Sequence, residues 1–481
     1  MIVELSREDL LSCLDLVSKG VSQRSPLPIL SSVLIRATAP QGGAANGLVE
    51  LTTTNLELVI CLPLAAAVYQ PGEIAVPFRV LVDTLKGIAD EKVRLETDAL
   101  RFIVRFGSGQ AALHCHPAQE FPLTPVVPDE ELGVRVPAAN MLRLIGRTAF
   151  AAADTQERPV LTGVHLLIDT ANKRLEAAAT DGFRMALAKE SVEHIPDYAQ
   201  PVGPVPLAGA DGVTLTNKVL GLLAQAGIET VEGVLERGRD ALVKIKGVGE
   251  KTVDHLLAAC ETILSRRGRL RGSFIAPATS LEVVGRIIQR VECEQVIMYQ
   301  AQQLTFQIGA ALVSTQLIDA RFPDYNAVIP NEERVASSLL FVCEALRGAL
   351  RLTDVLARHA GNTAKIRIGR KDEQTGVFLT AASAEHGDNS QFVPAVLNGE
   401  EMELAVNSRY LQEGLPVMGD DVRLGLLSPA EPLILRPDDN PDSFLYLVMP
   451  MQFSREAPAA APSVSSEEAT PAIATSEEIS G

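Results

Sequence analysis

Apolar and polar residues alternate along three stretches of the chain, each with a turn near its centre. The stretches begin at Val93, Glu294 and Asp421 and read VRLETDALRFIVRF, EQVIMYQAQQLTFQI and DVRLGLLSPAEPLIL. Alternation with a period of two is typical of half-buried β-strands. The pattern therefore predicts the same β-hairpin at three places.

Two helical patterns accompany each hairpin. One is a strand that continues into a helix, starting at Ala75, Ile275 and Leu404. The other is an amphipathic helix that opens each copy, in the segments SREDLLSCLDLV, VPAANMLRLIGRTAF and LLFVCEALRGALRL. Ser6 stands where the first of these helices begins and is predicted to cap it. The chain is therefore predicted to contain three copies of one α+β unit.

The spacing between equivalent residues locates an insertion in the second copy. Thr54 aligns with Thr180, 126 positions later, whereas Pro77 aligns with Pro277, 200 positions later. The second copy thus holds 74 additional residues between these points, and the second and third copies give the same difference. The flanking segments read as loop and strand, which places the insertion, here called the insert, at 207–272. Its helical patterning predicts a small all-α domain in a surface loop.

The repeats and the insert define the predicted domains. The last segment has five glutamates and no basic or aromatic residue, which is typical of a disordered tail. The predicted boundaries are 1–128 for domain one, 129–206 with 273–331 for a discontinuous domain two, 207–272 for the insert, 332–455 for domain three and 456–481 for the acidic tail.

The insert carries a sequence suited to phosphate binding, KIKGVGEKTVDHL at 244–256. Glycines ahead of a helix N-terminus let backbone N–H groups face a phosphate, and the helix dipole favours its negative charge. The candidate contacts are Lys246, Gly247, Gly249 and Lys251, with a basic exit segment at Arg266, Arg267, Arg269 and Arg271. Asp254 and His255 follow the turn closely and are interpreted as exposed helix residues.

Positive charge is concentrated on equivalent helices, although the chain has a formal net charge of −17. Such a chain should repel DNA unless its basic residues gather on one surface. Residues four or seven apart share a helix face. Four helices carry such pairs, and the candidate phosphate contacts are Arg79 with Lys86, Arg143 with Arg147, Arg286 with Arg290, and Arg347 with Arg351. The helix after Leu404 has only Arg409, with Glu413 four residues on.

Several other classes of protein are disfavoured. No run of 18 apolar residues exists, and the N-terminus does not have the pattern of a signal peptide, so a cytoplasmic location is expected. The six cysteines include no CxxC pair, which argues against zinc and against a disulfide framework. In His114-Cys115-His116, strand alternation would place the thiol opposite both imidazoles. No metal and no cofactor are expected.

Five further segments carry a resemblance to a known family. They are SQRSPLPIL at 22–30, RPVLTG at 158–163, ATDGFRMA at 179–186, ARFPDYNAVIP at 320–330 and YLVMPM at 446–451. With the threefold repeat, they make the chain similar to the bacterial DNA polymerase III β subunits, the sliding clamps, over about 1–206 and 273–453. The insert, in 226–256, resembles the C-terminal domain of the bacterial RNA polymerase α subunit and is of the helix-hairpin-helix type.

This resemblance implies a fold and a function. Each unit would place two helices inside and β-sheets outside, and one chain would form half of a head-to-tail homodimeric ring around duplex DNA. The ring would contact DNA without sequence specificity, and Arg24 would be a further DNA contact. It would act as a non-catalytic processivity factor near the nucleoid. Its partners would be the polymerase III α subunit, the clamp loader and other proteins with clamp-binding motifs.

The resemblance also implies two protein-binding surfaces. A slot between domains two and three would accept partner peptides, since methionine and branched aliphatic side chains suit an adaptable groove. The slot positions are Arg158, Leu161, Thr180, Gly182, Phe183, Met185, Pro323, Val328, Asn407, Tyr410, Leu447, Val448, Met449, Pro450 and Met451. The subunit interface would use Ala111 and Leu113 from domain one, and Val355 and Leu356 from domain three.

Two other functions are compatible with parts of the sequence. A helix-hairpin-helix repair enzyme would need a catalytic lysine, an aspartate or a carboxylate cluster, and none has a recognisable spacing. A scaffold built of repeats would lack the closed ring. For the insert itself, protein docking and additional DNA binding are both open.

Overall fold

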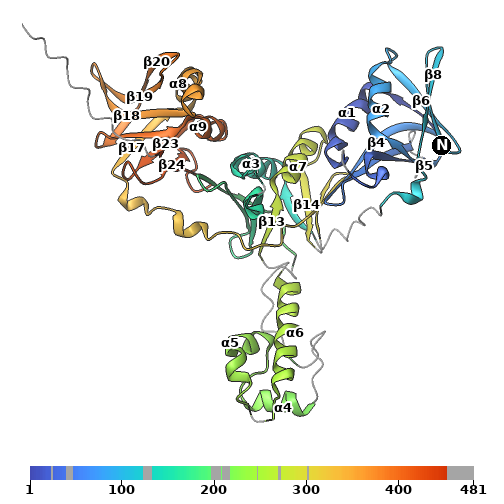
Figure 1. Ribbon diagram of the computed structural model, residues 1–481, viewed down its shortest axis with the longest axis horizontal. Coiled ribbons are helices and arrows are strands. Elements are labelled where there is room, and N and C mark those ends of the chain that lie inside the picture. Colours follow the sequence, from blue (N-terminus) through green and yellow to red (C-terminus); the bar gives the residue numbers. More distant parts are fainter. Residues whose placement is uncertain are drawn as a thin grey trace, which may run out of the picture.

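The computed structural model describes residues 1–22, 25–39, 47–122, 133–155, 157–196, 207, 217–245, 247–268, 272–300 and 303–451. In this part of the chain, three α+β units follow one another in an arc (Figure 1). The helices of each unit face the concave side of the arc and the sheets lie outside them. The prediction of three repeated α+β units is confirmed, with sheets and helices in the expected layers.

Unit one contains two α-helices that pack against β-strands. The side chain of Ser6 accepts a hydrogen bond from the backbone N–H of Asp9, so the predicted cap is confirmed. Its elements are β1 (Ile2–Ser6), α1 (Arg7–Val17), β2 (Ser32–Thr38), β3 (Gly47–Thr54), β4 (Leu58–Gln70), β5 (Gly72–Pro77), α2 (Phe78–Lys86), β6 (Lys92–Asp98), β7 (Arg101–Phe106) and β8 (Gly109–His114).

Unit two repeats this plan on both sides of the insert. Its first part contains β9 (Val134–Pro137), α3 (Ala138–Thr148), β10 (Gly163–Asp169), β11 (Arg174–Thr180) and β12 (Arg184–Ser191). Its second part contains β13 (Ser273–Pro277), α7 (Ala278–Arg290), β14 (Gln295–Gln300), β15 (Gln303–Ile308) and β16 (Ala311–Gln316).

Unit three completes the arc. The predicted hairpins of all three units are present, as β6–β7, β14–β15 and the third unit's β23–β24. Its elements are β17 (Ser337–Val342), α8 (Cys343–Ala357), β18 (Thr363–Lys371), β19 (Gln374–Ser383), β20 (Gly387–Pro394), β21 (Val396–Gly399), β22 (Glu403–Asn407), α9 (Ser408–Gly414), β23 (Asp421–Leu426), β24 (Leu433–Pro437) and β25 (Phe444–Val448).

The sheets continue from one unit into the next. β4 of unit one pairs antiparallel with β16 of unit two, and β12 of unit two pairs antiparallel with β25 of unit three. Backbone hydrogen bonds therefore join the units at both seams. These hydrogen bonds, together with side-chain packing, fix the position of each unit relative to its neighbour.

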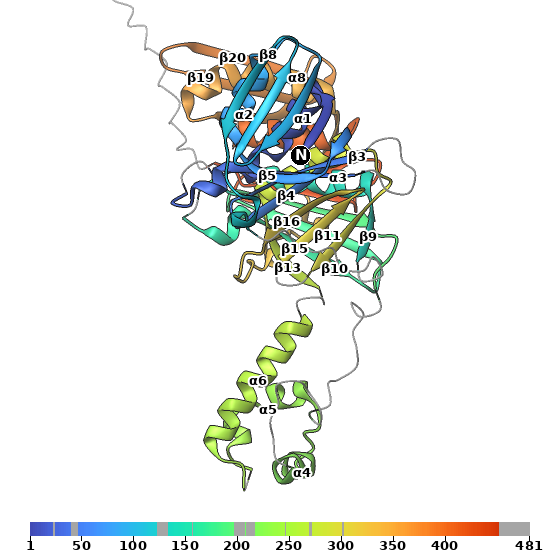
Figure 2. The same ribbon diagram turned by 90° about the vertical axis from the view of Figure 1, so that its right-hand side faces the viewer.

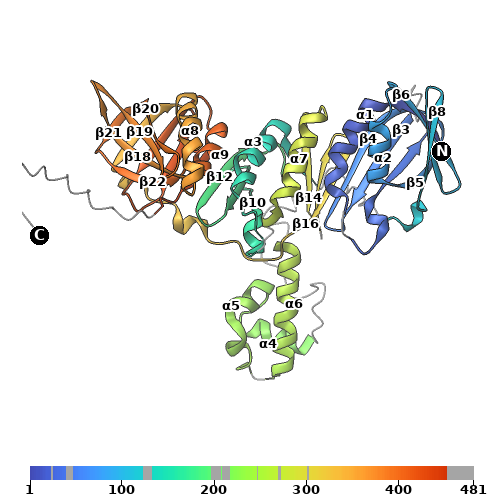
Figure 3. The same ribbon diagram turned by 45° about the horizontal axis from the view of Figure 1, so that its top comes forward.

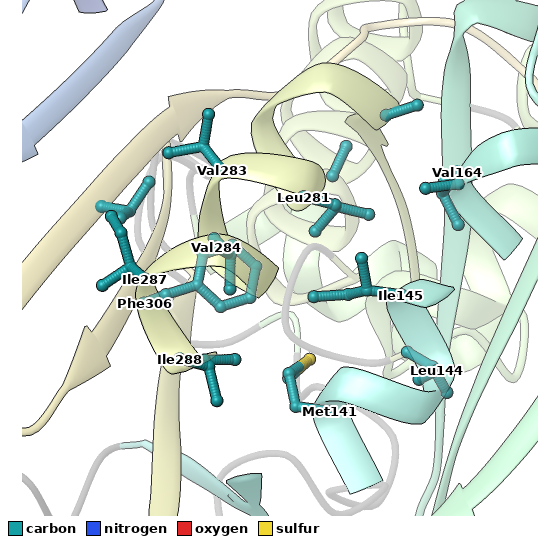
Figure 4. Packing of buried hydrophobic residues seen from close by; sticks show 14 of the residues in the cluster. Met141, Leu144, Ile145, Val164, Leu281, Val283, Val284, Ile287, Ile288 and Phe306 are labelled. Atoms are coloured by element: carbon teal, nitrogen blue, oxygen red, sulfur yellow. The ribbon is translucent and has the colours of Figure 1, made fainter. Parts of the chain in front are cut away.

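Helices α3 and α7 show how each unit builds its core. Met141, Leu144 and Ile145 of α3 face Val284 and other apolar residues of α7 (Figure 4). These side chains are at most 5% exposed and belong to one hydrophobic cluster that extends through the units. The i, i+3, i+4 spacing of apolar residues thus places one stripe of each helix on the sheets.

The insert forms a separate body with its own apolar cluster. It contains α4 (Asn217–Gln225), α5 (Val231–Leu242) and α6 (Glu250–Gly268), and Thr230 caps α5 by accepting a hydrogen bond from Gly233. Its buried residues include Leu223, Val234 and Leu256, none of which joins the main cluster. The insert projects from unit two on the side away from α3 and α7 (Figures 1, 2 and 3).

We predict that deletion of the insert leaves the three units folded, because the two apolar clusters are separate. A chain in which residue 206 is joined to residue 273 should keep the thermal unfolding midpoint of the body within about 2 °C. Differential scanning calorimetry of both chains measures this. Loss of the cooperative transition of the body would show instead that the insert is part of its core.

Candidate functional site

The seam between units two and three is the best-defined surface site. In the β12–β25 ladder, Met185 lies opposite Leu447 and both side chains are nearly fully buried on the outer face of the sheet. They pack in an outer cluster with Tyr325, together with Phe322 and Ile329. These last three residues belong to the segment that connects unit two with unit three, residues 317–336, here called the connector. The connector therefore covers the sheet where the two units meet.

Large apolar side chains remain exposed around this cluster. Phe183 is 64% exposed, Val328 is 56% exposed and Met449 is 42% exposed. The backbone N–H of Met449 donates to the carbonyl oxygen of Phe183 at 2.8 Å, so these two residues are adjacent. Exposed apolar residues next to a buried apolar cluster are typical of a protein-binding surface.

A tight turn between β11 and β12 presents Phe183. Gly182 has a φ of 95°, a left-handed conformation that favours glycine. The hydroxyl of Thr180 accepts from the N–H of Gly182 and donates to the carbonyl of Arg184, while the carboxylate of Asp181 accepts from the N–H of Phe183. The turn is thus held by its own side chains, and Phe183 is directed outward.

Arg184 of unit two is buried at the seam and contacts residues of unit three. Its side chain is only 5% exposed. Its guanidinium donates to Asp181 at 3.0 Å, to the carbonyl of Phe150 at 2.7 Å, and to Glu413 of unit three. It also lies over the ring of Tyr410, 4.6 Å from the centroid. A buried guanidinium requires such a complete set of partners, because an unpaired buried charge is costly.

Glu413 is held ionised by two arginines. Arg184 contacts one of its carboxylate oxygens and Arg409 donates to the other at 2.6 Å. Burial alone would raise the pKa of Glu413, but the hydrogen bonds from Arg409 and Arg184 outweigh burial and hold the pKa below its usual value. The seam is therefore stabilised by a carboxylate that must remain charged.

Unit three supplies the residues on the other side of the seam. The side chain of Asn407 caps α9 by accepting from the N–H of Arg409, and the hydroxyl of Tyr446 donates to the carbonyl of Tyr410 at 2.9 Å. Beyond β25, the N–H of Met451 donates to the carbonyl of Ala405 at 2.8 Å. The segment after β25 is thus anchored to β22 at the edge of the site.

The predicted slot residues differ in exposure. Leu161, Met185, Leu447 and Val448 are buried, and Thr180, Asn407, Tyr410, Pro450 and Met451 are intermediate. Arg158, Gly182, Phe183, Pro323, Val328 and Met449 are exposed. The prediction omitted Arg184, although it lies within ATDGFRMA; an arginine directly before the apolar run Met185–Ala188 was the signal that could have found it.

The basic residues lie on helices that face the concave side of the arc (Figure 1). Exposed on these helices are Arg79, Lys86, Arg143, Arg290 and Arg351, whereas Arg286 and Arg347 are half-buried. Arg147 has a different environment, because its side chain is only 14% exposed, donates to the hydroxyl of Ser443 and lies over the ring of Phe444. It therefore also ties unit two to unit three.

Carboxylates neutralise part of this charge. Arg143 pairs with Glu190 at 3.0 Å, while Arg347 and Arg351 both reach Glu344 at 2.9 and 3.5 Å. The partly exposed arginines would have to exchange these partners for any phosphate they bind. Arg24 lies outside the described residues.

Edge strands stand at the two ends of the arc. β8 is the terminal strand of one sheet and β20 is the terminal strand of another, and they lie at opposite ends (Figure 1). On β8, Ala111 and Leu113 are half-buried; on α8, Val355 is 58% exposed and Leu356 is half-buried. Edge strands offer unpaired backbone groups to another chain.

The turn between α5 and α6 lies in the body of the insert away from the arc. Gly247 has a φ of 100°, and the carbonyl of Gly249 accepts from Thr252 and Val253 at the start of α6. Gly247, Gly249 and Lys251 are exposed. Asp254 and His255 are exposed on α6, as predicted, and Asp254 pairs with Arg239 at 2.7 Å. Some predicted features lie outside the described residues, namely Lys246, Arg269, Arg271 and the acidic tail. The positions of Arg266 and Arg267 fall within α6.

Two negative findings concern the described part of the chain alone. No group of three or more His, Cys, Asp or Glu side chains there is arranged to hold a metal ion. Among the described helices, none has the length and apolarity to cross a membrane.

Replacement of Arg184 by methionine should destabilise units two and three by about 3–5 kcal/mol, because Glu413 and Asp181 lose a buried partner. Arg409→Met is the matched control: it removes the exposed arginine from the same carboxylate and should cost less than about 1 kcal/mol. Urea unfolding followed by circular dichroism measures both. Equal losses for the two variants would contradict the assigned role of Arg184.

The charge of Glu413 also predicts a pH dependence. Its pKa is lowered in the folded chain, so its stabilisation is present above the unfolded value of about 4.3 and is lost as the pH falls through the folded pKa. The difference in unfolding free energy between the parent chain and Glu413→Gln should be full at neutral pH and should shrink in acid. A difference that stays constant into strong acid would refute this.

Comparisons with known proteins agree with this geometry. Models of the N-terminal, central and C-terminal domains of the DNA polymerase III beta subunit match residues 1–125, 135–206 and 326–452, about two thirds of the chain together. The beta sliding clamp of Synechococcus elongatus is 28% identical over 450 residues, which cover 93% of this chain and 98% of that protein. That of Caulobacter vibrioides is 24% identical and covers 94% and 100%.

Solved structures show the same fold. The DNA polymerase sliding clamp of Bacillus subtilis has a TM-score of 0.69 at 20% identity, and the sliding clamp of Pseudomonas aeruginosa bound to griselimycin has a TM-score of 0.68 at 23% identity. Each comparison covers 94% of this chain and all of the other. The chain therefore belongs to the family of DNA polymerase III beta subunits, the beta sliding clamps, which are non-catalytic processivity factors of DNA replication.

Proposed function

We propose that two copies of this chain join head to tail into a ring around duplex DNA, and that the slot at the seam of units two and three tethers partner proteins to it. The observation that carries the proposal is that Phe183 and Met449, which are hydrogen-bonded to each other, and Val328 of the connector stay exposed next to the buried cluster of Met185, Leu447 and Tyr325. Exposed apolar side chains next to a buried apolar cluster favour binding of a partner protein.

The arc supplies the DNA-binding surface of this proposal. Helices of all three units face its concave side, and they carry the exposed Arg79, Lys86, Arg143, Arg290 and Arg351. Arginine and lysine on helices can contact phosphates without reading base sequence. Because a closed ring is retained by topology, these contacts can be weak enough for sliding. Association with DNA would place the ring at the nucleoid.

Ring closure would use the edge strands at the ends of the arc. β8, with Ala111 and Leu113, would face β20 and α8 of a second copy, with Val355 and Leu356. The exposed Val355 would become buried there, and pairing would satisfy the edge backbone groups. Duplex DNA, the polymerase III α subunit, the clamp loader and proteins with clamp-binding motifs are the proposed partners of the closed ring.

The insert has an accessory role in this proposal. Its helix-hairpin-helix character rests on the turn at Gly247 and Gly249, with Lys246 and Lys251 as further phosphate contacts. The insert projects away from the concave side, so this turn would meet DNA or a partner outside the ring rather than DNA within it.

A charge placed in the slot should abolish peptide binding. Met449→Asp introduces a carboxylate beside Phe183, and we expect a loss of at least about tenfold in affinity for a peptide from the polymerase α subunit. Fluorescence anisotropy with a labelled peptide measures this. Val396→Asp, at an apolar position of β21 that is 70% exposed, is the matched control and should bind normally.

The proposed slot would be wrong if Met449→Asp remained folded and bound the peptide as tightly as the Val396→Asp control. A parallel assay of primer extension separates binding from function. The slot variant should lose stimulation of the polymerase, while the control should retain it.

A further inference from the structure

The two seams within the chain are built in the same way. At the seam of units one and two, the backbone N–H of Gln316 donates to the carbonyl of Glu57 at 2.8 Å, directly beside the β4–β16 ladder. At the seam of units two and three, the N–H of Met449 donates to the carbonyl of Phe183 at 2.8 Å, directly beside the β12–β25 ladder. The same two positions of the repeat therefore meet at both seams.

Each of these pairs contributes to a surface site. Glu57 and Gln316 line one cavity of about 410 Å³, and Phe183 and Met449 are the exposed apolar residues of the slot. Residues directly opposite each other in an antiparallel pair have their side chains on one face, with Cβ atoms about 5 Å apart. The chemistry of the site at a seam is therefore set by the two residues that meet there.

The repeat identifies the first of the two residues that would meet where two copies join. β8 of unit one corresponds to β16 of unit two, because Arg101 lies opposite His114 in the β7–β8 hairpin, just as Gln303 lies opposite Gln316 in the β15–β16 hairpin. His114 therefore holds the position of Gln316, and hence that of Met449 in unit three.

The second residue follows from the equivalence of β20 with β12. Pro277 and Asn407 each come directly before the second helix of their unit. When strand partners are followed from these two residues across the sheets, Asp388 of β20 falls at the position of Met185 of β12. His386 comes two residues before Asp388, and it therefore holds the position two residues before Met185, which is the aromatic position of the slot.

The ring-closing joint, where β20 of one copy would meet β8 of the next, would consequently bring histidines together. This step rests on the ring proposed above. The N–H of His114 of the second copy would donate to the carbonyl of His386, as at the other two seams. His359, in the 3₁₀ turn η10 (Arg358–Ala360) after α8, stacks on His386, with ring centroids 4.2 Å apart and planes 20° apart. All three histidines are exposed in the single chain.

Three neighbouring imidazoles have a defined chemistry. Histidine is the commonest metal ligand in proteins, and imidazole suits zinc, copper and nickel. We propose that the ring-closing joint binds a divalent transition-metal ion through His359 and His386 of one copy and His114 of the next. One chain supplies only two of these imidazoles, so the complete set of ligands would exist only in the closed ring.

The surroundings of His386 fit this role. The hydroxyl of Ser383 lies 3.3 Å from Nδ1 of His386, which leaves Nε2 as the nitrogen for a metal ion. Asp388 is exposed two residues further along and offers a carboxylate as an additional ligand. The rings of His359 and His386 are exposed and can turn about their side-chain bonds, so the stacked pair can open around an ion. A ligand that binds the closed joint more tightly than the open chain stabilises the ring.

Sedimentation equilibrium of the full chain, with zinc as the probe, tests the proposal. The Kd of the dimer is measured first in a chelator and then in zinc, and zinc should lower it at least about tenfold, with one ion bound for each joint. In His114→Gln, His359→Gln and His386→Gln, the Kd in zinc should differ little from the Kd of the same variant in chelator. His255→Gln, at an exposed histidine of the insert, is the control and should respond to zinc as the parent chain does.

A mixture of two variants tests whether the ligands come from different copies. A dimer of one His114→Gln chain and one His386→Gln chain has one joint with all three histidines and one joint that lacks two. The mixture should therefore regain a response to zinc that neither variant shows alone. Circular dichroism checks that each variant is folded, which is expected because the replaced side chains are exposed.

The outcomes separate this proposal from that of the ring. Absence of dimers in both chelator and zinc would contradict the ring itself. Dimers that form in chelator and that zinc leaves unchanged would overturn the metal site alone. A zinc response that persists in all three histidine variants, or a mixture that regains none, would overturn the assignment of these ligands.

Discussion

The antiparallel pairing of β12 with β25 is the interaction on which the seam between units two and three depends. It makes one sheet from two units, and it places Met185 opposite Leu447 on the face that the connector covers. The same register puts Arg184 opposite Val448, with its guanidinium directed into the seam. The apolar slot is therefore a consequence of how the units are joined, and it does not belong to either unit alone.

The two faces of the seam are stabilised in different ways, the outer face by apolar packing and the inner face by buried ion pairs. On the outer face, apolar side chains form a floor and leave Phe183 and Met449 exposed. Inside, Arg184 and Arg147 are nearly buried and each is paired with carboxylates and an aromatic ring. Such buried pairs cost desolvation and add little net stability, but they penalise any other arrangement of the two units.

The repeated plan was predictable because its signals are local. Strand alternation, helix periodicity and the Ser6 cap act over a few residues, and the spacing argument separated the insert from the body. The family and its processivity function were also predicted and are confirmed.

Arg184 was missed because its partners Phe150 and Glu413 are 34 and 229 residues away in the chain. Arg147 was grouped with solvent-facing arginines for the same reason, since its partner Ser443 comes from another unit. At the slot, Val448 is buried in the main cluster whereas Met449, one residue beyond β25, is exposed, and this difference between two neighbouring apolar residues has no signature in the sequence.

The central claim is that this chain closes into a ring that DNA threads. The most direct measurement is retention of labelled protein on nicked circular DNA after loading, before and after a restriction enzyme linearises the circle. The account predicts that protein stays with the circle through gel filtration in salt and is lost once free ends appear. Equal retention on circular and linear DNA would show binding without encirclement and would contradict the ring.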